Sequence, residues 1–248
     1  MMNQVKTPTE ILAIRESGHM LAAVLRFLEA RTEPGITTGE LDRLAAAELK
    51  VLGGEPAFLG FEDFPAVICI SVNEEVVHGI PGPRELKAGD IVGLDFGVSF
   101  GGMITDGAIT IPVGTVSNDA TRLMRATRES LNLGIAQVRA GARLGDIAYA
   151  IETRLRADKL GVIEDLSGHG VGHQVHESPL VLNFGQAGRG MKLKSGMTIA
   201  IEPMATLGTK NIVQAQDGWT ILTADGSLGS QHEHTVLILP DGAEVLTV

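Results

Sequence analysis

The sequence contains few residues of the kinds that form disulfides or broad aromatic surfaces. Its 248 residues include one cysteine, Cys69, one tryptophan and one tyrosine. A single cysteine excludes an internal disulfide and is typical of a reducing compartment, so we expect a cytoplasmic protein. The sequence also has no cysteine cluster and no His-Glu-x-x-His segment. It therefore lacks the ligand patterns of structural zinc sites and of helical zinc-protease motifs.

Long apolar runs and basic runs are also absent. No window approaches the ~18 consecutive apolar residues that a membrane-spanning helix needs, so we expect no contact with a membrane. Residues 1–17 hold no apolar stretch of about 7 to 15 residues, which argues against a secretory peptide. Twenty basic against thirty acidic side chains give a formal net charge of -10 without a basic stripe. This charge argues against nucleic acid as a direct substrate and leaves a minority of carboxylates available to bind cations.

Two helices are predicted to open the chain, and strands follow them. Thr7-Pro8-Thr9-Glu10 and Thr37-Thr38-Gly39-Glu40 have the capping-box spacing, and apolar residues recur after each at helical intervals. Gly53-Gly54 ends the second helix. From Pro65 to Pro112 the chain is rich in β-branched residues and glycine, which predicts strands. With 44% hydrophobic residues, the chain has enough apolar side chains for a substantial core.

The same order recurs in the second part of the chain. Helical patterns over 119–138 and 145–160 precede strand-like residues 162–239. No linker-like composition separates the two parts. We therefore expect a single domain, residues 1–248, of the α/β class.

A short internal sequence similarity indicates that the two parts are related. Leu86–Asp95 aligns without gaps on Leu193–Glu202, and each copy has a Leu-Lys-x-Gly turn, an apolar strand and a final carboxylate. We interpret this similarity as a duplication with repeats over about 7–115 and 118–248. The duplication places Asp95 and Glu202 in equivalent positions across a pseudo-twofold axis. Ten aligned positions leave chance similarity open as the alternative.

Two carboxylates of the strand-rich first part are predicted to lie close together in space. Leu94-Asp95-Phe96 and Met103-Ile104-Thr105-Asp106 are typical of a hairpin that turns at Phe100-Gly101, which would place Asp95 directly opposite Asp106. Their Cβ atoms would then lie roughly 5 Å apart. Two carboxylates at that distance repel each other unless one is protonated or a cation lies between them. The alternative is a different turn register that leaves both groups in water.

Histidines and further acids gather in the second part. The segment Gly168–Glu177 has three histidines among glycines, and neutral imidazole is a ligand for first-row metals. Glu202 follows an apolar strand and precedes proline, and Glu233 lies just before another strand. Such strand-end carboxylates with one or two histidines favour a pair of manganese, iron, cobalt or zinc ions over a structural zinc. A plain loop and a solvated acid are the alternatives for the single segments.

Six segments in a fixed order carry a family resemblance. They are Val72-Asn73-Glu74-Glu75-Val76-Val77-His78-Gly79-Ile80-Pro81, Asp95-x10-Asp106, Gly168-His169-Gly170-Val171-Gly172, His176-Glu177-x-Pro179, Ile201-Glu202-Pro203-Met204 and Glu233-His234-Thr235. In this order, over nearly the whole chain, they resemble the signatures of type I methionine aminopeptidases. The resemblance implies the pita-bread fold, with two α/β halves around a curved, largely antiparallel sheet. It also implies an enzyme that removes the initiator methionine from nascent proteins when the next residue is small.

The resemblance further implies the metal ligands. Asp95, Asp106, His169, Glu202 and Glu233 would hold two divalent ions, cobalt, manganese, iron or zinc, with Asp106 and Glu233 bridging. His169 and Glu202 would complete the shell of one ion, and Asp95 that of the other. Glu202 would also transfer a proton.

The residues that contact the substrate are implied in the same way. His176 would stabilise the developing oxyanion, and His78 would contact the scissile nitrogen. The free α-amine would bind on the Asp95 side, so that only amino termini are cut. The methionine side chain would be lined by Phe61, Phe64, Cys69, His78 and Trp219, a set that suits a thioether.

Three positions depart from the pattern of the better-known bacterial relatives. Phe61 and Phe64 stand where tyrosines are found, and Val175 stands where phenylalanine is found. The smaller valine would loosen the pocket, so the strictness of methionine selectivity stays open. Phe64 also fits an ordinary core position. We expect His173, His232 and His234, which lie in or next to these segments, to be structural.

The expected partner is the amino terminus of a peptide or nascent polypeptide, which a monomeric enzyme would reach through transient ribosome contact. A proline-specific X-Pro peptidase of the same fold is the nearest alternative. Gly97-Val98-Ser99-Phe100-Gly101 also matches the nucleophile elbow of a serine hydrolase with Ser99 as nucleophile. An elbow needs a helix after the serine, whereas 102–111 is strand-like, which disfavours this alternative.

Overall fold

The structure is a computed structural model that describes residues 5–248. Met1–Gln4, the start of the stretch in which no secretory peptide is predicted, lie outside the described residues. The first half contains α1 Pro8–Glu29, α2 Thr38–Leu52, β1 Glu55–Pro56, the short 3-10 helix η1 Phe61–Asp63, β2 Ile68–Val72, β3 Glu75–Val77, β4 Ile91–Phe100 and β5 Met103–Pro112. The second half contains α3 Asn118–Ile135, α4 Leu144–Ala157, β6 Gly161–Val162, β7 Ser167–Gly170, β8 Glu177–Leu182, β9 Thr198–Ile201, β10 Met204–Thr206, β11 Ile212–Gln214, β12 Ile221–Thr223, β13 Gly229–Gln231, β14 His234–Ile238 and β15 Ala243–Val245.

The first two helices begin where the sequence predicts. The Thr7 hydroxyl accepts the backbone N–H of Glu10, and the Glu10 carboxylate accepts the backbone N–H of Thr7. Thr37 and Glu40 form the same capping box at α2, and Gly53 ends that helix in the left-handed conformation, with φ 84°. Local signals therefore set both helices before any long-range packing is considered.

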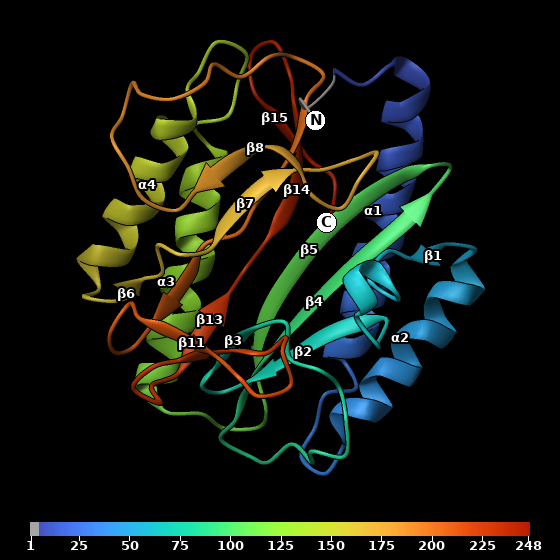
Figure 1. The fold of residues 1–248 in the computed structure, drawn as a ribbon, viewed down its shortest axis with the longest axis vertical. Helices are drawn as coiled ribbons and strands as arrows, with labels where there is room; N and C mark the ends of the chain where they lie inside the picture. Colours follow the sequence, from blue (N-terminus) through green and yellow to red (C-terminus); the bar gives the residue numbers. More distant parts are fainter. Residues whose placement is uncertain (1–4) are drawn as a thin grey trace.

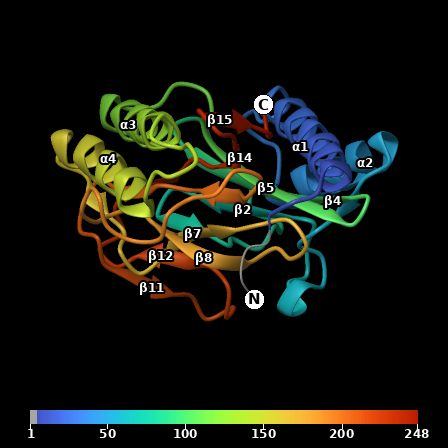
Figure 2. The same cartoon turned by 90° about the horizontal axis from the view of Figure 1, so that it is seen from above.

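The strands of the described residues pair in the antiparallel sense. β4 pairs with β1, β2 and β5, and the main sheet of the second half has the order β15-β14-β9-β7-β8. The remaining strand pairs, in two three-stranded sheets, are antiparallel as well. All four α-helices lie on one side of the strands (Figure 1, Figure 2), with α1 against β4 and β5 and α3 against α4. The predicted α/β class with largely antiparallel sheets is confirmed, and no described helix is long and apolar enough to cross a membrane.

The two similar segments, Leu86–Asp95 and Leu193–Glu202, begin with the same local structure. Gly89 and Gly196 both have positive φ, 101° and 84°, and a buried leucine begins each segment. β4 and β9 start directly after these turns. β4 continues beyond Asp95, however, whereas Glu202 lies just past the last residue of β9. The halves thus share a turn and a strand, and their origin by duplication within one domain stays a prediction.

The β4–β5 hairpin turns one residue later than the sequence analysis predicts. The turn residues are Gly101 and Gly102, with φ 58° and 78°. Two residues with positive φ form the tight turn that matches the twist of the strands. Asp95 therefore lies two residues away from the position opposite Asp106, and the prediction that the two face each other directly is wrong. They still share one face of the hairpin, because side chains alternate with a period of two.

The two halves meet where β5 runs beside the segment that carries Glu233. Ala108 and Glu233 exchange a pair of backbone hydrogen bonds, with N···O distances of 3.3 and 2.8 Å. On either side of this pair, the hydroxyls of Thr110 and Thr235 each donate to a backbone carbonyl and accept a backbone N–H of the opposite half, at 2.6 to 3.0 Å. The backbone that Thr235 holds is that of Asp106. This seam therefore fixes the two predicted bridging ligands relative to each other.

Candidate metal centre

One cavity of about 120 Å³ gathers every side chain to which the sequence analysis assigns a metal-binding, catalytic or substrate-binding role. Its lining consists of Phe58, Phe61, Glu62, Phe64, Cys69, His78, Asp95, Asp106, His169, Val175, His176, Glu202, Trp219 and Glu233. Phe58 and Glu62 had no predicted role. The three histidines expected to be structural are not part of this lining.

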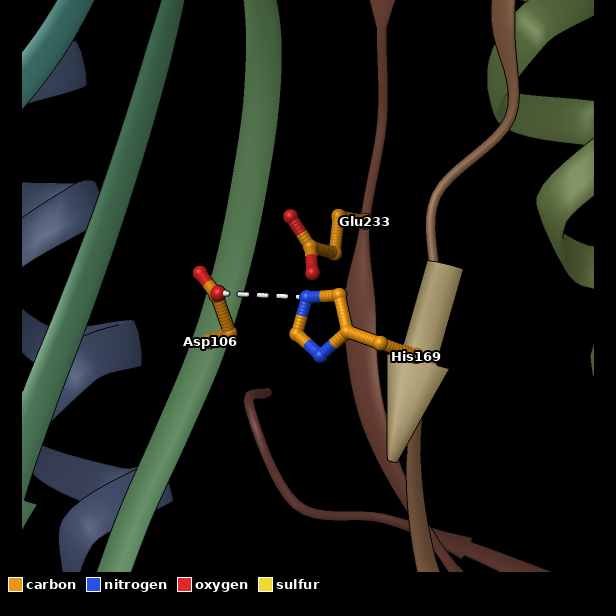
Figure 3. A group of neighbouring side chains, drawn as sticks. All are labelled: Asp106, His169 and Glu233. Carbon is orange, nitrogen blue, oxygen red and sulfur yellow. Dashed lines mark ion pairs between the residues drawn. The ribbon is translucent and has the colours of Figure 1, made fainter. Parts of the chain in front are cut away.

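The five predicted metal ligands come from five separate places in the sheets. Asp95 lies on β4, Asp106 on β5 and His169 on β7, while Glu202 follows β9 and Glu233 lies between β13 and β14. Figure 3 shows Asp106, His169 and Glu233 pointing toward one another, and their ligand atoms lie within 4.8 Å of each other. The Nε2 atom of His169 is 3.4 Å from Glu202 Oε1 and 3.8 Å from Asp106 Oδ2. Residues far apart in sequence thus converge on one point.

His169 is oriented so that Nε2 faces the acids. Its Nδ1 atom lies 2.9 Å from the Gly170 carbonyl oxygen, a contact in which Nδ1 carries the proton. Nε2 then has a free lone pair, which is the form in which imidazole binds a metal. Burial lowers the pKa of His169 to about 3, so the ring is neutral near pH 7.

Burial opposes negative charge on the four acids. It raises the pKa of Asp95 to about 7. It raises the pKa values of Asp106, Glu202 and Glu233 well above their ordinary range, and neighbouring carboxylates add to the rise. Without cations, the cluster retains protons that limit its charge. Two divalent ions would replace these protons and cancel the repulsion.

Unpaired oxygen atoms show that the cluster suits metal ions. Asp95 Oδ1, Asp106 Oδ1 and Glu233 Oε1 are buried and have no hydrogen-bond partner among the described residues. Buried polar atoms are nearly always paired, so each of these oxygens needs a ligand. Four carboxylates and one neutral imidazole form an oxygen-rich donor set that manganese, iron, cobalt and zinc accept. The residues present therefore fit a pair of divalent ions.

Two further histidines, His78 and His176, line the cavity beside the acids. The His176 ring meets the His169 ring edge to face, with centroids 4.4 Å apart, and meets the Phe61 ring at 5.4 Å. Burial lowers the pKa of His78 to about 4 and also lowers that of His176, so both rings are neutral near pH 7. His78 has φ 60°, a left-handed conformation that residues other than glycine rarely adopt. Neutral imidazoles at this place are able to donate hydrogen bonds to a polar group of a substrate.

An apolar pocket forms the other side of the cavity. Its buried members are Phe58, Phe64, Ala66, Cys69 and Val175, with Phe61 and Trp219 packed against them. The rings of Phe64 and Trp219 meet edge to face at 5.1 Å, so Phe64 lines the pocket and belongs to the core at once. Cys69 pairs with Asp95 across β2 and β4, which places the pocket directly beside the acids.

A groove of about 480 Å³ continues from the cavity on the other side of the histidines. It shares His78, His169, His176 and Glu202 with the cavity. The rest of its lining consists of Val77, Asp165, Leu166, Ser167, Glu177, Ser178, Leu180 and Met204. The acids and histidines therefore lie between a small apolar pocket and a larger groove.

Gln231 is a contributor to the site that the sequence analysis missed. Its Nε2 atom lies 3.5 Å from Glu202 Oε2 and 3.3 Å from Glu233 Oε2, so one amide bridges two predicted ligands. Phe58 was missed as well, because it precedes η1 in a segment without apolar periodicity. Gln231 ends β13 two residues before Glu233, and this spacing was the available signal, since side chains two residues apart in an extended segment share a face.

Ser99 does not occupy a nucleophile elbow. It lies inside β4, and β5 follows it after a tight turn. A nucleophile elbow requires a strand-to-helix turn at the serine. The serine hydrolase alternative is therefore excluded by the geometry.

Comparisons with known proteins agree with this geometry. Residues 13–240 match the model of metallopeptidase family M24, so the chain belongs to this family. Within it, the chain belongs with the methionine aminopeptidases. The chain is 46% identical to the methionine aminopeptidase of Clostridium perfringens over 98% of both chains. It is 44% identical to methionine aminopeptidase 1 of Mycobacterium tuberculosis over 96% of this chain and 92% of the relative. The crystal structure of methionine aminopeptidase from Thermotoga maritima matches with a TM-score of 0.98 at 41% identity over 99% of both chains.

More distant solved structures share the fold. Prolidase from Pyrococcus furiosus matches with a TM-score of 0.81 at 23% identity, over 99% of this chain and 66% of that chain. This likeness shows the fold alone. The predicted pita-bread fold and the resemblance to methionine aminopeptidases are confirmed, and the X-Pro peptidase is the less supported alternative.

Proposed function

We propose that this chain is a dinuclear metalloaminopeptidase that removes an N-terminal methionine from peptides and nascent proteins when the next residue is small. The observation that carries the proposal is a buried group of four carboxylates and one neutral imidazole beside an apolar pocket. Relatives named methionine aminopeptidase, at 41 to 46% identity over nearly the whole chain, support the same reaction.

Five residues would hold the two ions. They are Asp106 and Glu233, which the seam fixes relative to each other, together with Asp95, His169 and Glu202. When bound, such ions supply Lewis acidity and lower the pKa of a shared water. The donor set accepts cobalt, manganese, iron and zinc, so the metal depends on supply.

The chain's own groups provide proton transfer and hydrogen bonds. The Glu202 carboxylate would take a proton and return it to the leaving amine. The neutral ring of His176 would donate to the developing oxyanion, and His78 would contact the scissile nitrogen. The free α-amine of the substrate would lie on the Asp95 side, which restricts cleavage to amino termini.

The two sides of the cavity suit the two parts of the substrate. The apolar pocket that Phe64, Cys69 and Trp219 line would take the methionine side chain, because polarisable and aromatic groups favour a thioether. The remainder of the peptide would lie in the groove that shares His78 and His176 with the cavity. The requirement for a small second residue rests on the family resemblance.

The proposal extends to the setting in the cell. We propose a monomeric enzyme in the cytoplasm that meets nascent amino termini through transient contact with the ribosome. The single cysteine supports a reducing compartment. The nature of the substrate supports the contact with the ribosome.

Peptide assays with defined metals test the proposed reaction. Protein loaded with manganese, iron, cobalt or zinc should release methionine from Met-Gly-Met and Met-Ala-Ser, and a chelator should stop the release. Metal analysis of the same samples should give two ions per chain. Preferential cleavage of an X-Pro peptide would favour the alternative reaction, and cleavage that resists the chelator would contradict the metal centre.

A further inference from the structure

The loop that carries His176 contains no helix or strand. It joins β7, which carries His169, to β8, which begins at Glu177. The His176 ring meets the His169 ring edge to face, with centroids 4.4 Å apart. Any shift of this loop would therefore move the His176 imidazole relative to the metal ligands.

The carboxylate of Glu177 organises this loop. Its Oε1 atom accepts the backbone N–H groups of His173, at 2.6 Å, and Gln174, at 3.2 Å. Its Oε2 atom accepts a hydrogen bond from Lys6 Nζ at 3.0 Å. One side chain thus closes the loop and ties it to a residue 171 positions earlier in the sequence.

Lys6 reaches Glu177 through the interior of the protein. The Lys6 side chain is 0% exposed and that of Glu177 is 5% exposed, and the Lys6 backbone N–H donates to the Gly196 carbonyl at 2.8 Å. The lysine side chain passes directly over Gly172, where a Cβ would lie 2.5 Å from Lys6 Cε and 2.8 Å from Nζ. Gly172, the second residue of the loop, has φ 147° and no Cβ, so it adopts a conformation that favours glycine and leaves the space that the lysine side chain occupies.

A buried ion pair of this kind favours one arrangement more than it adds stability. Desolvation of the two charges offsets most of their attraction, whereas loss of one partner leaves an uncompensated buried charge. The arrangement that keeps Lys6 and Glu177 together is the one that places His176 beside His169. A second contact, between His173 and Glu10 of α1 at 2.8 Å, ties the loop to the same amino-terminal segment.

We propose that Lys6, through Glu177, is a positioning residue for His176. The proposal rests on the proposed function, because that function gives His176 its contact with the developing oxyanion. Lys6 itself lines neither the cavity nor the groove, so it acts through other residues.

Substitutions of Lys6 in the metal-loaded full chain test the proposal. Lys6→Met should lower kcat for Met-Gly-Met at least about tenfold and change KM less than about threefold, because a ~1 Å misplacement of a catalytic group costs up to about 10²-fold. Lys6→Arg keeps the cation and should recover most of kcat. Arg15→Met is the matched control, because it breaks the half-exposed 2.7 Å pair of α1 with Glu244. It should leave kcat within about twofold of wild type.

A double variant separates positioning from folding. Lys6→Met alone leaves a buried carboxylate without its cation and should lower Tm. Lys6→Met with Glu177→Gln removes both charges and keeps an oxygen for the two loop N–H groups, so Tm should recover while kcat stays low. If kcat recovers together with Tm, the pair has a structural role only and the proposal is wrong.

Combination with His176→Ala gives the decisive measurement. If Lys6 acts through His176, then Lys6→Met causes no further loss of kcat in the His176→Ala protein. An equal loss in both backgrounds would overturn the proposal. NMR of the histidine rings gives a readout without turnover: Lys6→Met should shift the His176 signals and leave those of His78 unchanged. Failure of the wild-type protein to cleave methionyl peptides would refute the proposed function, while the NMR comparison would still decide whether Lys6 positions His176.

Discussion

The two sides of the cavity hold their side chains by different means. On the metal side, hydrogen bonds across the seam between the halves fix the backbone of Asp106 and Glu233. On the apolar side, aromatic rings such as those of Phe64 and Trp219 are held by apolar packing and edge-to-face contacts. Loss of one metal-ligand charge should remove a bond to the ions that no neighbouring group replaces. Loss or gain of one methylene group in an apolar pocket changes the binding free energy by only about 1–3 kcal/mol. The metal side should therefore tolerate no substitution, and the apolar side should tolerate several.

The largest effect is expected for Asp106→Asn. The amide keeps the shape of the side chain but lacks the charge that would bridge two dications, so turnover of Met-Ala-Ser should fall at least about 10³-fold. The metal-free variant should be no less stable than metal-free wild type, because the amide is always neutral, whereas the Asp106 carboxyl, whose pKa burial raises, must hold a proton in the folded state. Kinetics, metal analysis and thermal unfolding measure these outcomes.

An exposed acid serves as the control for this substitution. Asp119 lies on α3 with its side chain 71% exposed, so Asp119→Asn should keep full activity. If Asp106→Asn retained activity as well, the assignment of the bridging ligand would be wrong. Loss of activity together with loss of the folded structure would instead show that Asp106 is needed for folding even without metal.

The next largest effect is expected for His176→Ala. The substitution removes a neutral donor but no metal ligand, so kcat should fall about 10²-fold while the metal content stays the same. His173→Ala is the matched control in the same loop: it removes the side-chain contacts with Glu10 at 2.8 Å and with Glu177 at 3.6 Å but keeps the backbone N–H that Glu177 accepts. It should lower kcat less than about threefold. Equal losses in the two variants would indicate that the loop, and not the His176 ring, matters.

Metal removal should change how stability depends on pH. Without metal, the raised pKa values of Asp95, Asp106, Glu202 and Glu233 mean that the folded state holds protons that the unfolded state has released. The free energy of unfolding then falls as pH rises, by about 1.4 kcal/mol per pH unit for each carboxyl that stays protonated. Buried histidines with lowered pKa values act in the opposite sense, but only up to about pH 7.5, where unfolded histidines have lost their protons.

Denaturant unfolding at pH 7.5 and pH 9 measures this difference for Asp106, Glu202 and Glu233, because Asp95, with a pKa of about 7, has lost most of its proton by pH 7.5. The metal-free protein should lose more stability over the interval than the metal-replete protein, in which dications take the place of the protons. The same slope in both samples would mean that the carboxyls are charged without metal. That result would remove the electrostatic reason for a dication pair at this place.

Local sequence signals predicted the helices and the strands near the site, but not the register of the central hairpin. The capping boxes at Thr7 and Thr37 involve residues three positions apart and were confirmed. The sequence allowed the hairpin to turn at Phe100-Gly101 or one residue later, at Gly101-Gly102. The structure uses the second turn, in which both glycines adopt positive φ. That difference of one residue changed the partner of Asp95 without removing it from the site.

Contacts between distant segments lay beyond any local pattern. Lys6 and Glu177 meet across 171 residues, and Asp106 and Thr235 meet across 129 residues. Spacing alone also left the choice of ligands open, because a histidine-glycine loop and single strand-end acids each have a plain structural alternative. The resemblance of six ordered segments to one family selected the five ligands from the sequence. The structure then places all five side chains around one cavity.

The smallest effect is expected on the apolar side, for Val175→Phe. Val175 is 4% exposed and belongs to the same cluster as Phe58 and Phe61. A phenylalanine would fill space that valine leaves, so selectivity for methionyl over leucyl peptides should rise about tenfold while kcat/KM for Met-Gly-Met changes less than about threefold. Val175→Ile, of intermediate volume, should give an intermediate ratio. If Val175→Phe instead stopped methionine release while both ions stayed bound, the pocket would be already full with valine, and position 175 would control entry of the methionine itself rather than rejection of other side chains.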